Sequence, residues 1–139
     1  MDRRLAFLTA LLGFTAVALG AMGAHAVKGL VLGLPDAADR LNWWEIGARY
    51  HLIHTLAVGL VAVLSAHVTS RFPNIAAGLF TLGILLFSGS LYVMALTGVR
   101  TLGAVTPFGG LCFLAGWVAL GFGARGLGRQ KEAPRPGEP

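Results

Sequence analysis

The chain has 139 residues, of which 55% are hydrophobic and only 12% are charged, and its formal net charge is +5. The charged share is about half that of an average soluble domain, too small to cover a globule of this size, and this excludes a soluble fold. The basic residues lie at segment ends and form no stripe with aromatic residues between them, so nucleic acid is not an expected partner. The single cysteine, Cys112, excludes an internal disulfide.

Residues 5–27, 50–70, 72–99 and 101–124 contain no Asp, Glu, Lys or Arg, and each of these runs is long enough to cross a hydrocarbon core of about 30 Å. They predict four transmembrane helices, at about 5–27, 46–66, 74–96 and 105–123. The first segment follows Arg3-Arg4 and ends in Ala24-His25-Ala26, as in a secretory signal peptide. Its apolar run is longer than the usual core of such a peptide, roughly 7–15 residues, so we expect a retained helix rather than cleavage.

The connector between the first two helices has a mixed character. Asp36 and Asp39 have the spacing of a capping box with Asp in place of Glu, and Trp43 and Trp44 stand where an aromatic belt at the membrane–water boundary is expected. Residues 36–45 are therefore predicted to be an interfacial helical stretch that leads into the second helix.

The end of the chain differs from the rest. Residues 125–139 contain three of the six prolines and mixed charges, and are predicted to be a disordered cytoplasmic tail. Residues 1–124 then form a single four-span transmembrane domain.

The orientation of the bundle follows from its basic residues, because cytoplasmic loops carry an excess of Lys and Arg. The N-terminus, the 67–73 turn and the tail together hold Arg3, Arg4, Arg71, Arg125, Arg129, Lys131 and Arg135. The opposite side holds Lys28, Arg40, Arg49 and Arg100. We therefore expect an all-α integral membrane four-helix bundle with both termini in the cytoplasm.

Polar side chains within the spans gather at one depth, in the extracytoplasmic half of the predicted bundle. They come from all four helices and comprise His25, Tyr50, His51, His54, Ser88, Ser90, Tyr92 and Thr106. An unsatisfied polar group in lipid costs several kcal/mol, so these side chains should face the interior of the bundle. We predict in particular that His25, His51, His54, Ser88 and Ser90 converge, since His51 and His54 share one helix face.

Three interpretations of the histidines stay open. The favoured one is structural, because polar side chains between transmembrane helices are commonly interhelical hydrogen bonds worth about 0.6 kcal/mol each. The first alternative is a small channel, carrier or proton relay, since ionisable residues inside a membrane are functional candidates. The second is a metal or haem site at His25, His51 and His54, although no carboxylate or CxxC motif supports that ligand set.

The sequence carries no motif of a soluble enzyme. It has no P-loop, GxSxG, HExxH or Rossmann fingerprint, and only Glu45 among its acidic residues lies near a membrane segment. We expect a non-enzymatic structural or accessory protein that needs no cofactor. Its partners are the lipid bilayer and, through small-residue faces that let helices approach closely, a homo-oligomer or a larger membrane complex. These faces are Ala16, Gly20 and Ala24 on the first helix and Ala115, Ala119 and Gly123 on the fourth.

Four motifs occur in order along the chain. They are Gly20-Ala21-Met22-Gly23-Ala24-His25, Tyr50-His51-x-x-His54, Phe87-Ser88-Gly89-Ser90-Leu91-Tyr92 with Thr97-Gly98, and Thr106-Pro107-x-Gly109-Gly110 with Gly116-Trp117. In these motifs, from about residue 13 to residue 120, the chain resembles the uncharacterised small membrane family of bacterial YgdD and eukaryotic transmembrane protein 256; Met22 stands where phenylalanine is expected. The resemblance implies a four-span, multi-pass protein of the inner (plasma) membrane with an uncleaved first helix. It supplies no substrate, cofactor or reaction.

Overall fold

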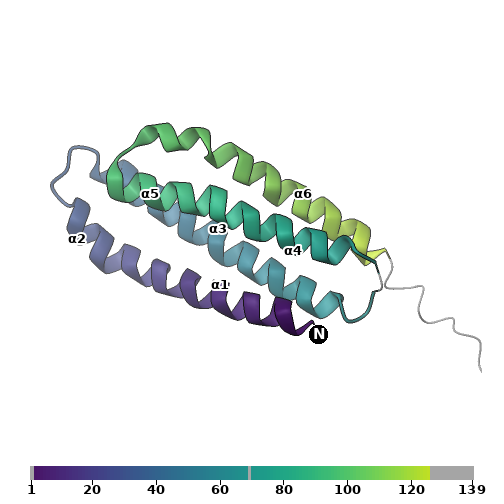
Figure 1. Cartoon of the computed structure of the whole chain (residues 1–139). Coiled ribbons are helices and arrows are strands. Elements are labelled where there is room, and N and C mark those ends of the chain that lie inside the picture. The colour runs from purple at the N-terminus through teal and green to yellow at the C-terminus, as the bar shows by residue number, and fades with distance from the viewer. Residues whose placement is uncertain (1, 69, 126–139) are drawn as a thin grey trace, which may run out of the picture.

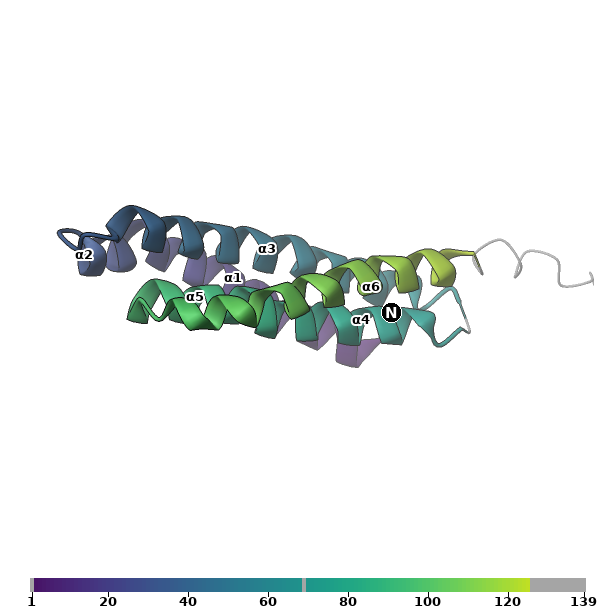
Figure 2. The ribbon, with the colours of Figure 1, turned by 90° about the horizontal axis from the view of Figure 1, so that it is seen from above.

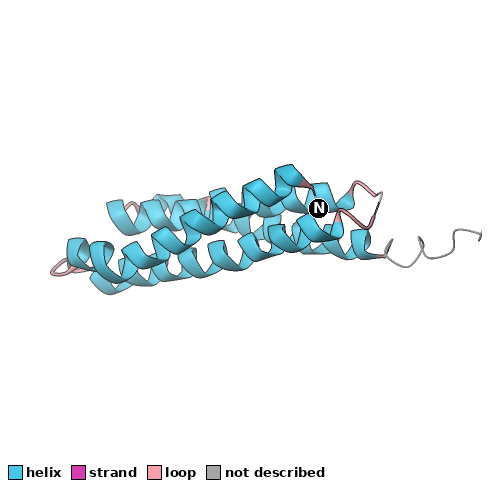
Figure 3. Cartoon of the chain, turned by 90° about the horizontal axis from the view of Figure 1, so that it is seen from below, coloured by secondary structure: helices cyan, strands magenta, loops and turns pink. Residues whose placement is uncertain are grey.

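The computed structural model describes residues 2–68 and 70–125, which are helical almost throughout and contain no strand (Figure 3). The first long segment consists of α1 (Arg3–Met22), the π-helical turn η1 (Gly23–Val27) and α2 (Lys28–Val31), and the second is α3 (Ala37–Leu64). The third consists of α4 (Phe72–Gly83), the π-helical turn η2 (Ile84–Ser88) and α5 (Gly89–Thr97), and the fourth of the 3-10 turn η3 (Arg100–Ala104) and α6 (Thr106–Ala124). Each segment is long and apolar enough to cross a membrane. The predicted all-α, four-span membrane fold is confirmed.

The four segments run lengthwise beside one another, alternating in direction (Figures 1 and 2). The beginning of α1, the turn between α3 and α4, and the end of α6 lie at one end, which we call the terminal end (Figure 1). The opposite, distal end carries the connector between α2 and α3 and the turn after α5. Both ends of the described chain therefore lie on one side of the membrane; that this side is the cytoplasm stays a prediction.

The third and second segments form the centre of the bundle. α1 packs on α3, α3 packs on α4, η2 and α5, and α6 packs on α4 and η2, whereas α3 and α6 touch at only a few points. One apolar core lies toward the terminal end and includes Val58, Val61, Phe80 and Phe113. A smaller core at the distal end joins Val27, Val31, Trp44, Tyr92 and Ala95.

The charged stretch 36–45, predicted as an interfacial helix, is continuous with the second span in α3, which begins at Ala37. Its charges do not interrupt the helix because they pair along it. Arg40 Nε lies 2.9 Å from Asp36 Oδ1, and Arg49 lies 3.2 Å from Glu45, both at i,i+4 spacing. Of the predicted disordered tail, only Arg125 lies among the described residues.

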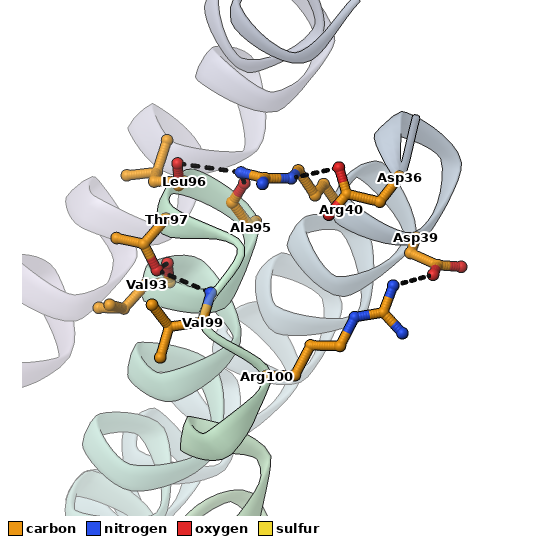
Figure 4. Close-up of polar contacts among 9 residues, drawn as sticks. All are labelled: Asp36, Asp39, Arg40, Val93, Ala95, Leu96, Thr97, Val99 and Arg100. Carbon is orange, nitrogen blue, oxygen red and sulfur yellow. Dashed lines mark hydrogen bonds and ion pairs between the residues drawn. The ribbon is translucent and has the colours of Figure 1, made fainter. Parts of the chain in front are cut away.

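Arg40 also connects α3 to α5 at the distal end of the bundle (Figure 4). Its guanidinium donates to the carbonyl oxygens of Ala95 (3.4 Å) and Leu96 (3.2 Å), in the last turn of α5. A positive charge is favourable there because the final carbonyls of a helix have no intrahelical partner. Arg100 forms a second, exposed ion pair with Asp39 at 2.9 Å. The start of α3 is thereby tied to the end of α5.

Candidate functional site

His51 is almost fully buried on α3 and links three helices. Its Nδ1 lies 3.3 Å from the hydroxyl of Tyr92 on α5, and its Nε2 lies 3.5 Å from Oγ1 of Thr15 on α1. The Thr15 hydroxyl donates to carbonyls of its own helix, so the consistent arrangement has His51 Nε2–H donating to Thr15 and Tyr92 O–H donating to Nδ1. Both ring nitrogens are then satisfied within the protein.

His54, one turn further along α3, has a separate set of partners. Its Nδ1 lies 2.8 Å from the carbonyl oxygen of Tyr50, which can only accept, so Nδ1 carries the proton. In the neutral ring Nε2 is then an acceptor, and the indole Nε1–H of Trp117 on α6 points to it at 3.4 Å. The imidazole also stacks on Phe113, with ring centroids 3.5 Å apart and planes at 8°. His54 thus connects α3 to α6.

The predicted convergence of three histidines is wrong for His25. That side chain is exposed, and its Nδ1 lies 3.2 Å from the carbonyl oxygen of Ala21 on its own helix. His51 and His54 are both buried, as predicted, but they point to different neighbours. Within residues 2–68 and 70–125, no group of three His, Cys, Asp or Glu side chains could hold a metal ion. The weak metal candidates His25, His51 and His54 therefore do not form a site together.

The remaining polar residues of the predicted cluster lie between the third and fourth segments or near them. Ser90 Oγ donates to the carbonyl of Phe87 at 2.9 Å and lies 2.8 Å from Oγ1 of Thr106, which links α5 to α6. Ser88 is fully buried in η2, and its hydroxyl has no hydrogen-bond partner in the described part of the chain; the same holds for Thr55 on α3. Tyr50 is 40% exposed and packs its ring on Phe87.

Trp44 joins α3 to the first segment through contacts that the sequence did not indicate. We expected it in an interfacial belt, yet its side chain is buried and its Nε1–H donates to the carbonyl of Leu19 at 2.9 Å. The indole lies directly against Gly23, where an added Cβ would be 2.5 Å from it. The glycine of the first motif therefore makes room for a tryptophan from α3 beside the π-helical turn η1.

Gly109, the first glycine of the pair in the fourth motif, has an equivalent role between α6 and η2. A Cβ added at Gly109 would lie 2.7 Å from Cβ of Phe87 and would collide with its backbone nitrogen. α6 can approach η2 this closely only because position 109 has no side chain. The two π-helical turns in the described part of the chain, η1 and η2, thus lie at tight interhelical contacts, in keeping with the frequent occurrence of such turns at functional sites.

A groove lies between α3 and α6, beside His54. Its volume is about 530 Å³. The residues that line it are Tyr50, Ile53, His54, Phe87, Pro107, Gly110, Leu111, Phe113, Leu114 and Trp117. Aromatic rings therefore form much of its wall, and the polar atoms of His54 and Trp117 meet at its edge.

These features define a four-span integral membrane protein whose intramembrane polar side chains connect neighbouring helices. The chain belongs to the family described as "Protein of unknown function (DUF423)", whose model matches residues 19–110. It is a multi-pass protein of the inner (plasma) membrane, as the four spans and the relatives below indicate.

Relatives from several bacteria match most of the chain. It is 39% identical to a UPF0382 membrane protein of Haemophilus influenzae over 89% of this chain and 95% of the relative. It is 40% identical to the inner membrane protein YgdD of Escherichia coli K12 over 93% and 95%, and 41% identical to the membrane protein YwdK of Bacillus subtilis over 76% and 82%. The predicted family resemblance is confirmed. No solved structure matches the chain.

Proposed function

We propose that this protein is a non-enzymatic accessory protein of the membrane, which acts through its helical surface on a second copy of itself or on a larger membrane complex. The observation that carries the proposal is the engagement of the buried imidazoles. Both ring nitrogens of His51 and of His54 form hydrogen bonds with other groups of the protein, and the hydroxyl of Ser90 is hydrogen-bonded to that of Thr106. Side chains held in this way stabilise a bundle, and an imidazole with both nitrogens engaged in the protein fits a structural rather than a catalytic role.

The surface of the first segment supports an association through helices. α1 packs mainly on α3 and presents Phe7, Phe14 and other large apolar side chains outward. Gly20 and Ala24 of its small-residue face are exposed as well, whereas Ala119 and Gly123 of α6 are already buried inside the bundle. Ala16 is buried and Ala115 is exposed, so each face is divided. Close approach of another helix is available on α1 at Gly20 and Ala24, whereas most of the predicted small face of α6 is occupied internally.

Cysteine cross-linking in native membranes tests this proposal. The natural thiol is removed by Cys112→Ser, and Ala24→Cys then places a reporter on the exposed α1 face. Leu85→Cys, which lies on another exposed surface, serves as the control. We expect a discrete cross-linked product, either a dimer or a complex with one other protein, from Ala24→Cys alone. A protein that stays monomeric with both reporters, in cells and in mild detergent, would contradict the accessory role.

A proton relay is the second candidate, because Thr15, His51 and Tyr92 form a line of polar atoms across three helices. The line is short, since the Thr15 hydroxyl donates back into its own helix. Proteoliposomes with a pH gradient decide between the two. Proton flux that is abolished by His51→Phe would replace the accessory proposal with a relay.

A further inference from the structure

The groove between α3 and α6 has the size and position of a site for a lipid-soluble molecule. Its volume of about 530 Å³ falls within the usual range of small-molecule sites, roughly 300–1,000 Å³. It extends along α6 from Pro107 to Trp117, or about 15 Å at the rise of an α-helix. Both helices belong to membrane-spanning segments, so the groove opens toward lipid rather than water. A ligand would enter it from the bilayer.

The aromatic side chains of the groove favour a flat ligand over an acyl chain. Tyr50 lies 4.6 Å from Phe87 between ring centroids, and Phe87 lies 5.6 Å from Phe113. Tyr50 and Trp117 line the groove and are 40% and 45% exposed, so part of each ring is not covered by neighbouring side chains. A planar ring can stack on these surfaces or meet them edge to face, and a saturated chain gains no such interaction.

One pair of polar atoms at the groove edge favours a ligand with a group that both donates and accepts a hydrogen bond. The Trp117 Nε1–H and the His54 Nε2 acceptor are 3.4 Å apart, longer than the 2.7–3.2 Å of ordinary N–H hydrogen bonds. A hydroxyl group placed between them would donate to Nε2 and accept from Nε1–H, so that both atoms gain a better partner. A carbonyl group could only accept, which would leave Nε2 without a donor.

We propose that this groove binds a membrane-soluble molecule with a planar ring that bears a hydroxyl group, of the phenol or quinol class. The ring lies among Tyr50, Phe87 and Trp117, and its hydroxyl bridges Trp117 Nε1 and His54 Nε2. The half-exposed indole of Trp117 moves outward to admit the oxygen. This site goes beyond the accessory function and does not depend on it, because the α1 face proposed for association lies outside the groove.

Equilibrium partition into lipid nanodiscs tests the proposal with a defined pair of probes. The full chain is placed in phosphatidylcholine nanodiscs and compared with empty ones. The probes are 1-naphthol and its methyl ether, 1-methoxynaphthalene, which has the same ring but no hydroxyl proton. We expect saturable retention of 1-naphthol at one molecule per chain, above the level of empty nanodiscs. The ether should bind about fivefold more weakly, because it cannot donate to His54.

Two tryptophan substitutions localise the binding. Leu114→Trp adds a large ring inside the groove, and Leu56→Trp adds the same ring on a lipid-facing surface of α3 outside it; both leucines are 65% exposed. Retention of 1-naphthol should be lost with Leu114→Trp and unchanged with Leu56→Trp. Three results would overturn the proposal: no saturable retention, which means that acyl chains fill the groove; equal retention of the ether, which means a nonselective apolar slot; or unchanged binding to Leu114→Trp.

Discussion

The close contact between Gly109 of α6 and the backbone of η2 gives a sharp test of the packing. At Gly109 an added methyl would lie 2.7 Å from Cβ and 2.8 Å from Cα of Phe87, and it would also collide with the backbone nitrogen of that residue. Backbone atoms in η2 cannot turn aside as the end of a flexible side chain can. At the neighbouring Gly110 the same methyl would lie 3.9 Å from the Phe87 ring, which is an ordinary contact. Gly109→Ala and Gly110→Ala are therefore matched variants.

The expected difference between the two variants follows from these contacts. Each substitution gains the same helix preference of Ala over Gly, about 0.5–1 kcal/mol. Only Gly109→Ala carries the cost of overpacking, typically about 1–3 kcal/mol, because α6 must move away from η2. The free energies of unfolding should then differ by about 1–3 kcal/mol, and Gly110→Ala should be as stable as the unsubstituted chain or more stable.

Unfolding by titration with a denaturing detergent, from mild micelles and followed by circular dichroism, measures this difference. Both variants are first shown to be helical and monodisperse under the starting conditions. If Gly109→Ala unfolds with the same free energy as Gly110→Ala, α6 does not approach η2 as closely as described. The inference that position 109 must lack a side chain for α6 to pack on η2 would then be wrong.

Three further predictions concern the polar contacts and the orientation. Tyr92→Phe should lower the free energy of unfolding by about 0.6 kcal/mol, and by no more than about 1.7, because it removes the hydroxyl that meets His51. Tyr50→Phe should have no such effect, since no described residue is a hydrogen-bond partner of the Tyr50 hydroxyl. At the distal end, the hydrogen bond from Arg40 holds the pKa of Asp36 below its ordinary value of 3.8. The pair therefore stabilises the fold above that pH, and this contribution should disappear as the pH falls through the lowered pKa; Arg40→Gln should abolish that acid-dependent part of the detergent midpoint. Finally, tags at either terminus should be accessible from the cytoplasm alone, and labelling of a terminal tag from outside intact cells would reverse the predicted orientation.

The spans of this protein could be predicted from sequence because the bilayer imposes a simple requirement. A charge within the hydrocarbon is costly, so the charge-free runs mark the helices. The start of α3 was harder to place. The charges of Asp36, Asp39, Arg40 and Glu45 place this stretch outside the predicted span, whereas i,i+4 pairing keeps it in one helix with the residues that follow.

The positions of the histidines could not be predicted in the same way. Val27 faces the core at the distal end, and His25, two residues before it in the π-helical turn η1, is exposed on another side of the segment. Since α1 is apolar on all sides, its sequence does not reveal which face is buried. His51 and His54 are three residues apart, which leaves them about 60° apart around the axis of α3. That angle matters because α3 has neighbours on several sides, so one ring reaches α1 and α5 and the other reaches α6.

The four motifs of the family resemblance meet one another in space, and their contacts separate packing from binding. His51 of the second motif contacts Tyr92 of the third, and Ser90 of the third contacts Thr106 of the fourth. The polar atoms of these side chains are engaged in interhelical hydrogen bonds. Tyr50 and Trp117 are different, because each contributes to a contact and still leaves about two-fifths or more of its surface exposed. The open part of each ring lines the groove next to the His54 acceptor, where the ring of the proposed ligand would stack on it.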